Sequence, residues 1–166
     1  MVMNLLITGS TPSQRETVIN QLMERLEEPI GGLRRAKITP VTHELEDVEN
    51  GETTHVAGTD EETGPQVEQK HIDVERLSDT AQAAIDDAIR KGRVIVIDTI
   101  GKVEMHSSTF REAVRDAFRG SEDVIAFVDD QYVDMYDEEG RVINIDGQTP
   151  EEATRAILKK INEQDV

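Results

Sequence analysis

Cysteine and tryptophan are absent from the 166-residue chain, and aromatic residues make up only 3% of it. The absence of cysteine excludes disulfides, thiolate zinc sites and cysteine nucleophiles. Because aromatics are scarce, Val, Ile, Leu and Ala must fill the core. No apolar run approaches the roughly 18 to 20 residues of a membrane span, and Met1–Gly9 lacks the basic flank and cleavage site of a signal peptide. We therefore expect a cytoplasmic protein with no membrane partner.

Positive charge is also in short supply. The chain has 18 Lys and Arg against 35 Asp and Glu, a formal net charge of −17. Such a surface repels phosphate backbones, so we expect no nucleic-acid partner. The carboxylates are spread along the whole chain rather than gathered in one tail, and a self-repelling surface is tolerable in concentrated salt. We interpret the acidic surface as a halophilic adaptation, in which most carboxylates carry no chemistry.

Short apolar runs alternate with amphipathic segments along the chain. Continuous runs predict buried strands at Met3–Thr8, Val94–Ile97, Val124–Val128 and Val142–Ile145. Apolar residues at helical spacing predict a helix after the first run, a helix capped by Ser78, and further helices starting at Ser108 or Thr109 and at Thr149. Helices between apolar strands imply right-handed crossovers. The sequence therefore predicts a single α/β domain over 1–166, with three layers and a mostly parallel sheet.

Three other segments interrupt this pattern. Polar, β-branched stretches at Ile38–Val48 and Glu52–Ala57 flank Asn50-Gly51, a dipeptide typical of tight hairpins, and predict a hairpin insertion. The acidic stretch at about 59–70 has no apolar period and predicts an exposed, mobile loop. The span Asp129–Gly140 predicts a second acidic loop. Its Asp129-Asp130 pair could bind Mg²⁺ or Ca²⁺, but the spacing misses the calcium-loop pattern and favours a solvated face.

Ligands of such a sheet bind beyond the carboxyl ends of the strands, beside helix N-termini. Two segments occupy these positions, Gly9–Thr17 and Asp98–Glu104, and we expect their strands to be neighbours in the sheet. A phosphate-binding loop follows the pattern G-x-x-x-x-G-K-S/T, in which backbone N–H groups surround the anion. Only Gly9 fits it strictly. The four histidines are isolated in the sequence and predict no metal site: His43, His55, His71 and His106.

The stretch Val96–Met105 reads VIDTIGKVEM and is followed by Phe110-Arg111. It resembles the IDEIGKMEL…F signature of a small nucleoside-triphosphatase family first described in thermophiles. The likeness extends to the opening LLITG, to Ile30-Gly31-Gly32 and to Thr149-Pro150-Glu151. It implies a P-loop fold that hydrolyses ATP, GTP and other nucleoside triphosphates.

By position, the resemblance assigns three residues of this stretch to the reaction. Asp98 would hold Mg²⁺ through water, Lys102 would approach the phosphates, and Glu104 would orient the loop; a hard cation prefers such oxygen ligands. The first loop would bind the nucleotide through Gly9, Ser10, Ser13, Gln14, Arg15 and Thr17.

The chain departs from the family pattern at both segments. Thr99 stands where the family has a second acid that activates water, and loss of a positioned base costs about 10²- to 10⁴-fold in rate. Gln14-Arg15-Glu16 replaces the family's Gly-Lys-Thr. A local interpretation explains the same loop, because Thr11-Pro12-Ser13-Gln14 is a capping box that would start the helix near Pro12 and shorten the phosphate loop.

These features lead to three hypotheses. The first is a divergent nucleoside-triphosphatase that binds a nucleotide such as ATP or GTP, with Mg²⁺ as cofactor and weak or lost hydrolysis. The second is a non-catalytic scaffold that binds a protein partner on a P-loop fold. The third is a competent NTPase or small-metabolite kinase that uses Arg15 and an acid from elsewhere in the chain. Fold alone does not separate them.

Overall fold

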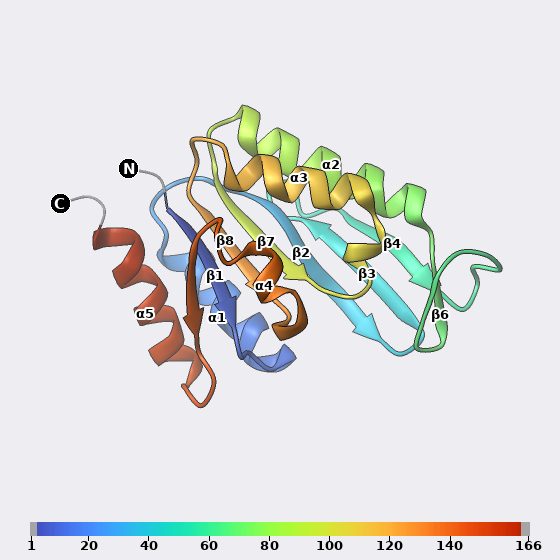
Figure 1. Ribbon diagram of the computed structural model, residues 1–166, viewed down its shortest axis with the longest axis horizontal. Coiled ribbons are helices and arrows are strands. Elements are labelled where there is room, and N and C mark those ends of the chain that lie inside the picture. Colours follow the sequence, from blue (N-terminus) through green and yellow to red (C-terminus); the bar gives the residue numbers. More distant parts are fainter. Residues whose placement is uncertain (1–2, 164–166) are drawn as a thin grey trace.

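A computed structural model describes residues 3–163, and the ends of the predicted 1–166 domain lie outside this range. Nine strands form one sheet in the order β5-β6-β4-β3-β2-β7-β8-β1-β9 (Figure 1). Their bounds are β1 (Asn4–Thr8), β2 (Ile30–Thr39), β3 (Thr42–Asp47), β4 (Thr53–Gly58), β5 (Gln66–Val67), β6 (Lys70–Ile72), β7 (Val94–Ile100), β8 (Val124–Val128) and β9 (Arg141–Asn144). The helices are α1 (Pro12–Arg25), α2 (Val74–Arg90), α3 (Ser108–Phe118), α4 (Val133–Tyr136) and α5 (Pro150–Asn162).

The sheet divides into two halves. Strands β2, β7, β8, β1 and β9 run parallel, as crossovers through helices require. Strands β2, β3, β4, β6 and β5 are joined by antiparallel pairings. The α/β class and the layered arrangement are confirmed, but the sheet is mixed rather than mostly parallel, because the hairpin insertion adds a whole antiparallel half.

Each face of the sheet has its own apolar core. One core joins α2 and α3 to one face, and the other joins α1 and α5 to the opposite face. The periodicity of the first helix is confirmed, since Val18, Ile19 and Leu22 are buried beneath the sheet. Two covered faces explain why the central strands are continuously apolar. No helix of the described part is both long and apolar enough to cross a bilayer.

Helix starts follow capping chemistry. The capping box at Thr11 is present, so α1 begins at Pro12 as the local interpretation predicts, and Thr149 forms a second capping box before α5. The predicted cap at Ser78 is wrong. Asp73 accepts from the Arg76 N–H at 2.9 Å and caps α2 five residues before the predicted cap. Ser107 caps α3, so the predicted start at Ser108 is confirmed.

The hairpin region holds one more turn than predicted. Asn50-Gly51 does join two strands, β3 and β4, but Ile38–Val48 is not one strand because a turn at Pro40-Val41 ends β2 and starts β3. Proline has no N–H for a ladder and fits a turn.

Both predicted acidic loops contain regular structure. The stretch 59–70 includes the short β5 and the first residue of β6. That residue, Lys70, is 1% exposed, and its Nζ donates to the Thr39 carbonyl at 2.7 Å. Within Asp129–Gly140, helix α4 places Tyr136 against Phe118, with ring centroids 5.7 Å apart. The last strand, β9, begins one residue before the predicted Val142.

Candidate functional site

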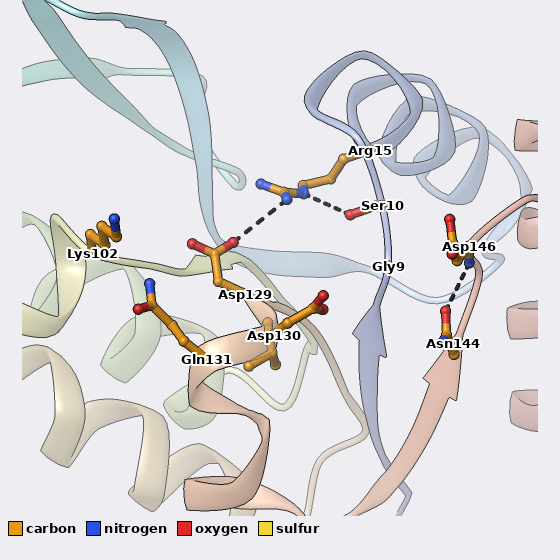
Figure 2. Close-up of a pocket in the computed structure, with 10 residues that line it drawn as sticks. Gly9, Ser10, Arg15, Lys102, Asp129, Asp130, Gln131, Asn144 and Asp146 are labelled. Carbon is orange, nitrogen blue, oxygen red and sulfur yellow. Dashed lines mark hydrogen bonds and ion pairs between the residues drawn. The ribbon is translucent and has the colours of Figure 1, made fainter.

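Arg15 lies at the centre of a charged cluster at the carboxyl edge of the parallel strands. Its Nε donates to the Ser10 hydroxyl at 3.1 Å, its Nη1 lies 3.7 Å from Asp98 Oδ1, and its Nη2 lies 3.7 Å from Asp129 Oδ1. Figure 2 shows the guanidinium reaching from α1 towards Asp129 and Ser10. Arg15 is 7% exposed and Asp98 is 4% exposed. The two segments singled out in the sequence therefore meet through one ion-pair cluster.

The strands that carry these segments are not neighbours. Strand β8 lies between β1 and β7, so the expectation of adjacent strands is wrong. Asp129 follows β8, and Arg15 lies within 3.7 Å of both the Asp98 and the Asp129 carboxylates. Sequence reasoning assigned Asp129 to a solvated face, although the rule applied to Asp98 covers it too, because each follows a buried strand directly.

A cavity of about 570 Å³ opens beside this cluster, and we call it the Arg15 cavity. Lys102 is an exposed lysine that faces it across Asp129 and Gln131 (Figure 2). The lining residues are Gly9, Ser10, Arg15, Lys102, Val128, Asp129, Asp130, Gln131, Asn144 and Asp146. Gly9 has φ +79°, and a Cβ at this position would clash with the Asn144 side chain and the Asp146 backbone. Glycine is thus required where β1 ends.

Two further hollows adjoin this region. Arg15 and Asp98 also line a cavity of about 350 Å³ together with Arg34, Arg35 and Glu16. The other residues of the first loop face elsewhere. Gln14 donates to the Gln148 carbonyl at 2.6 Å. It lines a groove of about 480 Å³ with Thr17 and Ser13, on the Asp146–Gln148 side. The structure therefore brings Gly9, Ser10, Arg15 and Lys102 together, and sets Gln14 and Thr17 apart.

Glu104 lies in a second charged cluster, beneath the α2 and α3 layer. The side chain is fully buried; its Oε2 lies 2.6 Å from His43 Nε2 and its Oε1 lies 3.6 Å from Arg35 Nη2. The sequence indicated that His43 is isolated, but β3 brings it into contact with Glu104. Across the described residues, no group of three His, Asp or Glu side chains is arranged to hold a metal ion.

Burial and pairing shift the acidities of these groups. Burial raises the pKa of Asp98 above its ordinary value, although Arg15 and Arg35 oppose this shift. Burial likewise raises the pKa of Asp129 and lowers that of Arg15. For Glu104, burial opposes ionisation, but the contact with His43 and the charge of Arg35 outweigh it and hold the pKa below its ordinary value. Such perturbed groups cluster at functional sites.

Thr99 offers no base to the site. Its hydroxyl donates to the Phe127 carbonyl of β8 at 2.8 Å, and the residue is 1% exposed. The side chain therefore fastens β7 to β8 instead of facing the Arg15 cavity. Asp129 does line the cavity, but its carboxylate lies 3.7 Å from the Arg15 guanidinium.

The residues that the resemblance assigns to Mg²⁺ do not fit the ion in this arrangement. Mg²⁺ needs only one or two carboxylates but keeps several of its waters. Asp98 Oδ1 faces Arg15, its Oδ2 accepts from the Arg35 main-chain N–H at 3.3 Å, and the side chain is almost completely buried. The Arg15 guanidinium already lies 3.7 Å from Asp98 Oδ1, so a cation at this carboxylate would meet like charge.

Comparison with known proteins gives a consistent family. A family model described as NTPase matches residues 4–158. The nucleoside-triphosphatase THEP1 of Korarchaeum cryptofilum is 35% identical over 67% of this chain and 60% of its own length. That of Methanothermobacter thermautotrophicus is 28% identical, over 96% of this chain and 95% of its own length.

Solved structures share the fold. The crystal structure of THEP1 from Aquifex aeolicus superposes with a TM-score of 0.76 at 23% identity, covering 96% of each chain. The solution structure of a human cancer-related nucleoside triphosphatase gives a TM-score of 0.80 at 18% identity, covering 98% of each chain. The P-loop NTPase-like fold expected from the resemblance is thereby confirmed.

Proposed function

The chain belongs to the nucleoside-triphosphatase (NTPase) family, and from that premise we propose that it binds nucleoside triphosphates in the Arg15 cavity and hydrolyses them slowly. The observation that carries the proposal is that two cationic side chains, Arg15 and Lys102, line one cavity at the start of α1. Helix N-termini favour anions because their N–H groups and dipole point at the ligand.

The first turn of α1 suits an anion better than the comparable turn of α5. Both helices begin with a Thr-Pro capping box, but α5 carries Glu151 and Glu152 in its first turn, whereas α1 has no acidic residue there. The phosphates would lie against the Gly9-Ser10 backbone, which lines the cavity beside Arg15.

Three aspartates also line the cavity, so it does not select for negative charge alone. Asp129 is balanced by Arg15 at 3.7 Å. Asp130 and Asp146 stand beyond Asp129, towards β9 (Figure 2). Their carboxylates accept hydrogen bonds, as ribose hydroxyls require. We assign the phosphates to the Arg15 and Lys102 side and the sugar to the Asp130 and Asp146 side.

We infer slow turnover because Thr99 stands where the resemblance places the acid that activates water. Attack by water requires a group that takes its proton, and Thr99 is tied to β8. Lys102 would bind phosphate oxygens and Arg15 would neutralise charge that develops during phosphoryl transfer. Glu104, which does not line the cavity, would act by positioning Arg35 rather than by touching substrate.

The test is nucleotide-dependent thermal stabilisation followed by an assay of phosphate release. Both are run in dilute buffer and in about 1 M KCl, where charge repulsion is screened beyond about 3 Å. A nucleotide at 100 times its dissociation constant should stabilise the folded state by about 2.7 kcal/mol. Lys102→Met should lose most of this gain, whereas Lys159→Met, on the exposed face of α5, should retain it. No shift with any nucleoside triphosphate would overturn the proposal.

A further inference from the structure

We infer that the guanidinium of Arg15 takes the place of the protein-held divalent cation, so that this chain binds the triphosphate without Mg²⁺ at Asp98. The inference rests on the proposed function and specifies how its site handles phosphate charge. It begins from the position of Arg15, which lies between the carboxylates that end two neighbouring strands, β7 and β8.

The guanidinium has donors left for a ligand. Arginine presents five N–H donors in a rigid fork. In Arg15 the Nε bonds the Ser10 hydroxyl, while Nη1 and Nη2 approach Asp98 and Asp129 at 3.7 Å, longer than a hydrogen bond. These Nη donors lie beside the Arg15 cavity, which the same residue lines. One group can therefore bridge protein carboxylates and ligand phosphate, as a bound metal ion otherwise does.

A divalent ion would meet both steric and electrostatic opposition at this position. Asp98 is 4% exposed, and Oδ2 of its carboxylate already accepts from the Arg35 main chain, so little of the carboxylate is left for a hydrated ion. The ion would also sit beside Arg15, where like charge repels it. Asp98 Oδ1 has no hydrogen-bond partner of its own, and it is the oxygen that faces the Arg15 guanidinium.

A lysine could not fill this role in the same way. An ammonium is a compact point charge on a flexible stem, whereas the fork of Arg15 reaches Ser10, Asp98 and Asp129 at once. The replacement of the phosphate-loop lysine by Arg15 is thus more than a conserved charge. It supplies the group that spans the two carboxylates.

The first test titrates Mn²⁺, a spectroscopic substitute for Mg²⁺, into nucleotide-free protein and follows the free ion by electron paramagnetic resonance. The wild-type chain should bind no Mn²⁺ at Asp98, and Arg15→Gln should gain a site that Asp98→Asn then removes. Arg34→Gln is the matched control, because Arg34 lines the neighbouring cavity and its Nη1 donates to Asn20. A wild-type Mn²⁺ site that Asp98→Asn abolishes would overturn the inference, and so would a folded Arg15→Gln protein without one.

The second test measures the dissociation constant of a non-hydrolysable triphosphate with Mg²⁺ and with EDTA. The two values should agree within about threefold for the wild type and for Arg34→Gln, and differ by about tenfold or more for Arg15→Gln. A wild-type requirement for Mg²⁺ would overturn the inference. If Arg15→Gln does not fold, the inference is tested by the Mn²⁺ titration and the dissociation constants of the wild type and of Arg15→Lys. Failure to bind nucleotide under either condition would defeat the proposed function, while the Mn²⁺ titration would still test Arg15.

Discussion

Two buried carboxyl groups, six residues apart, have pKa values that are shifted in opposite directions. Asp98 lies near the end of β7 and Glu104 lies just after it, and both are shielded from solvent. Burial raises the pKa of Asp98, whereas the contact with His43 and the charge of Arg35 hold the pKa of Glu104 below its ordinary value. Burial acts on both in the same direction, so the partners decide the outcome.

The partners differ in distance and in what lies beyond them. His43 touches Glu104 at 2.6 Å inside the α2 and α3 face, while Arg15 stays 3.7 Å from Asp98 and borders a cavity. The tight His43–Glu104 pair therefore has a structural role, whereas the looser Arg15–Asp98 pair leaves the Arg15 guanidinium available to a ligand. The following predictions test this contrast, from the largest expected effect to the smallest.

Glu104→Gln should produce the greatest loss of stability. The change leaves the Arg35 guanidinium without its buried counter-ion, and breaking a buried ion pair typically costs about 3–5 kcal/mol. The free energy of unfolding, measured in urea, is the readout. Glu44→Gln, on the strand that carries His43, is the control and should change little because this residue is partly exposed. A loss no larger than that of the control would show that the tight pair is not structural.

Asp98→Asn should cost less stability, about 1–2 kcal/mol, because the amide still accepts from the Arg35 N–H and an unfavourable buried charge is removed. Phosphate release should nevertheless fall by about 10²- to 10³-fold, since Arg15 loses its partner. Asp130→Asn serves as the comparison at the cavity surface. Unchanged turnover in Asp98→Asn would refute its place in the site.

The pH dependence of stability should have opposite signs at the two positions. The lowered pKa of Glu104 contributes stability above the unfolded value of 4.5, and that contribution is lost as pH falls through the folded pKa. The raised pKa of Asp98 has the reverse effect, because stability is lost as pH rises from 3.8 through the folded pKa.

Unfolding free energies measured from about pH 3 to 7 should therefore diverge. Relative to the wild type, Asp98→Asn should become more stable as pH rises, and Glu104→Gln less stable. Parallel curves for the two variants would contradict the opposite shifts.

The smallest effect concerns the helix start that presents Arg15. Thr11→Ala and Thr149→Ala should each cost about 1 kcal/mol, because each removes a side-chain cap. Only Thr11→Ala should also weaken nucleotide binding, since α1 carries Arg15 to Asp98 and α5 does not. Equal effects of the two variants on nucleotide binding would show that binding in the cavity does not depend on the start of α1.

Much of this arrangement could be predicted from sequence because it depends on local chemistry. Thr11-Pro12-Ser13-Gln14 specifies its own cap, apolar periodicity specifies the faces of α1 and α3, and the position of Asp98 after a buried strand places it at the ligand edge. The VIDTIGKVEM stretch gave the correct family.

The remainder depends on strand order and long-range pairing, which local patterns do not encode. The insertion of β8 between β1 and β7 brings Asp129 to Arg15. His43 and Glu104 are 61 residues apart in the sequence but in contact in the fold, and the residues that flank each of them give no sign of this pairing. Asp73, five residues before Ser78, caps α2, and because Asp and Ser are both favoured caps their identity alone did not select between them.

The most direct measurement is a crystal structure of the wild-type chain with a non-hydrolysable nucleoside triphosphate and Mn²⁺, with the ion located by anomalous scattering. We expect the phosphates between the Gly9-Ser10 backbone and Lys102, with the guanidinium of Arg15 still between Asp98 and Asp129 and no manganese at those carboxylates. Phosphates bound elsewhere, or manganese between the two aspartates with Arg15 displaced, would contradict this assignment.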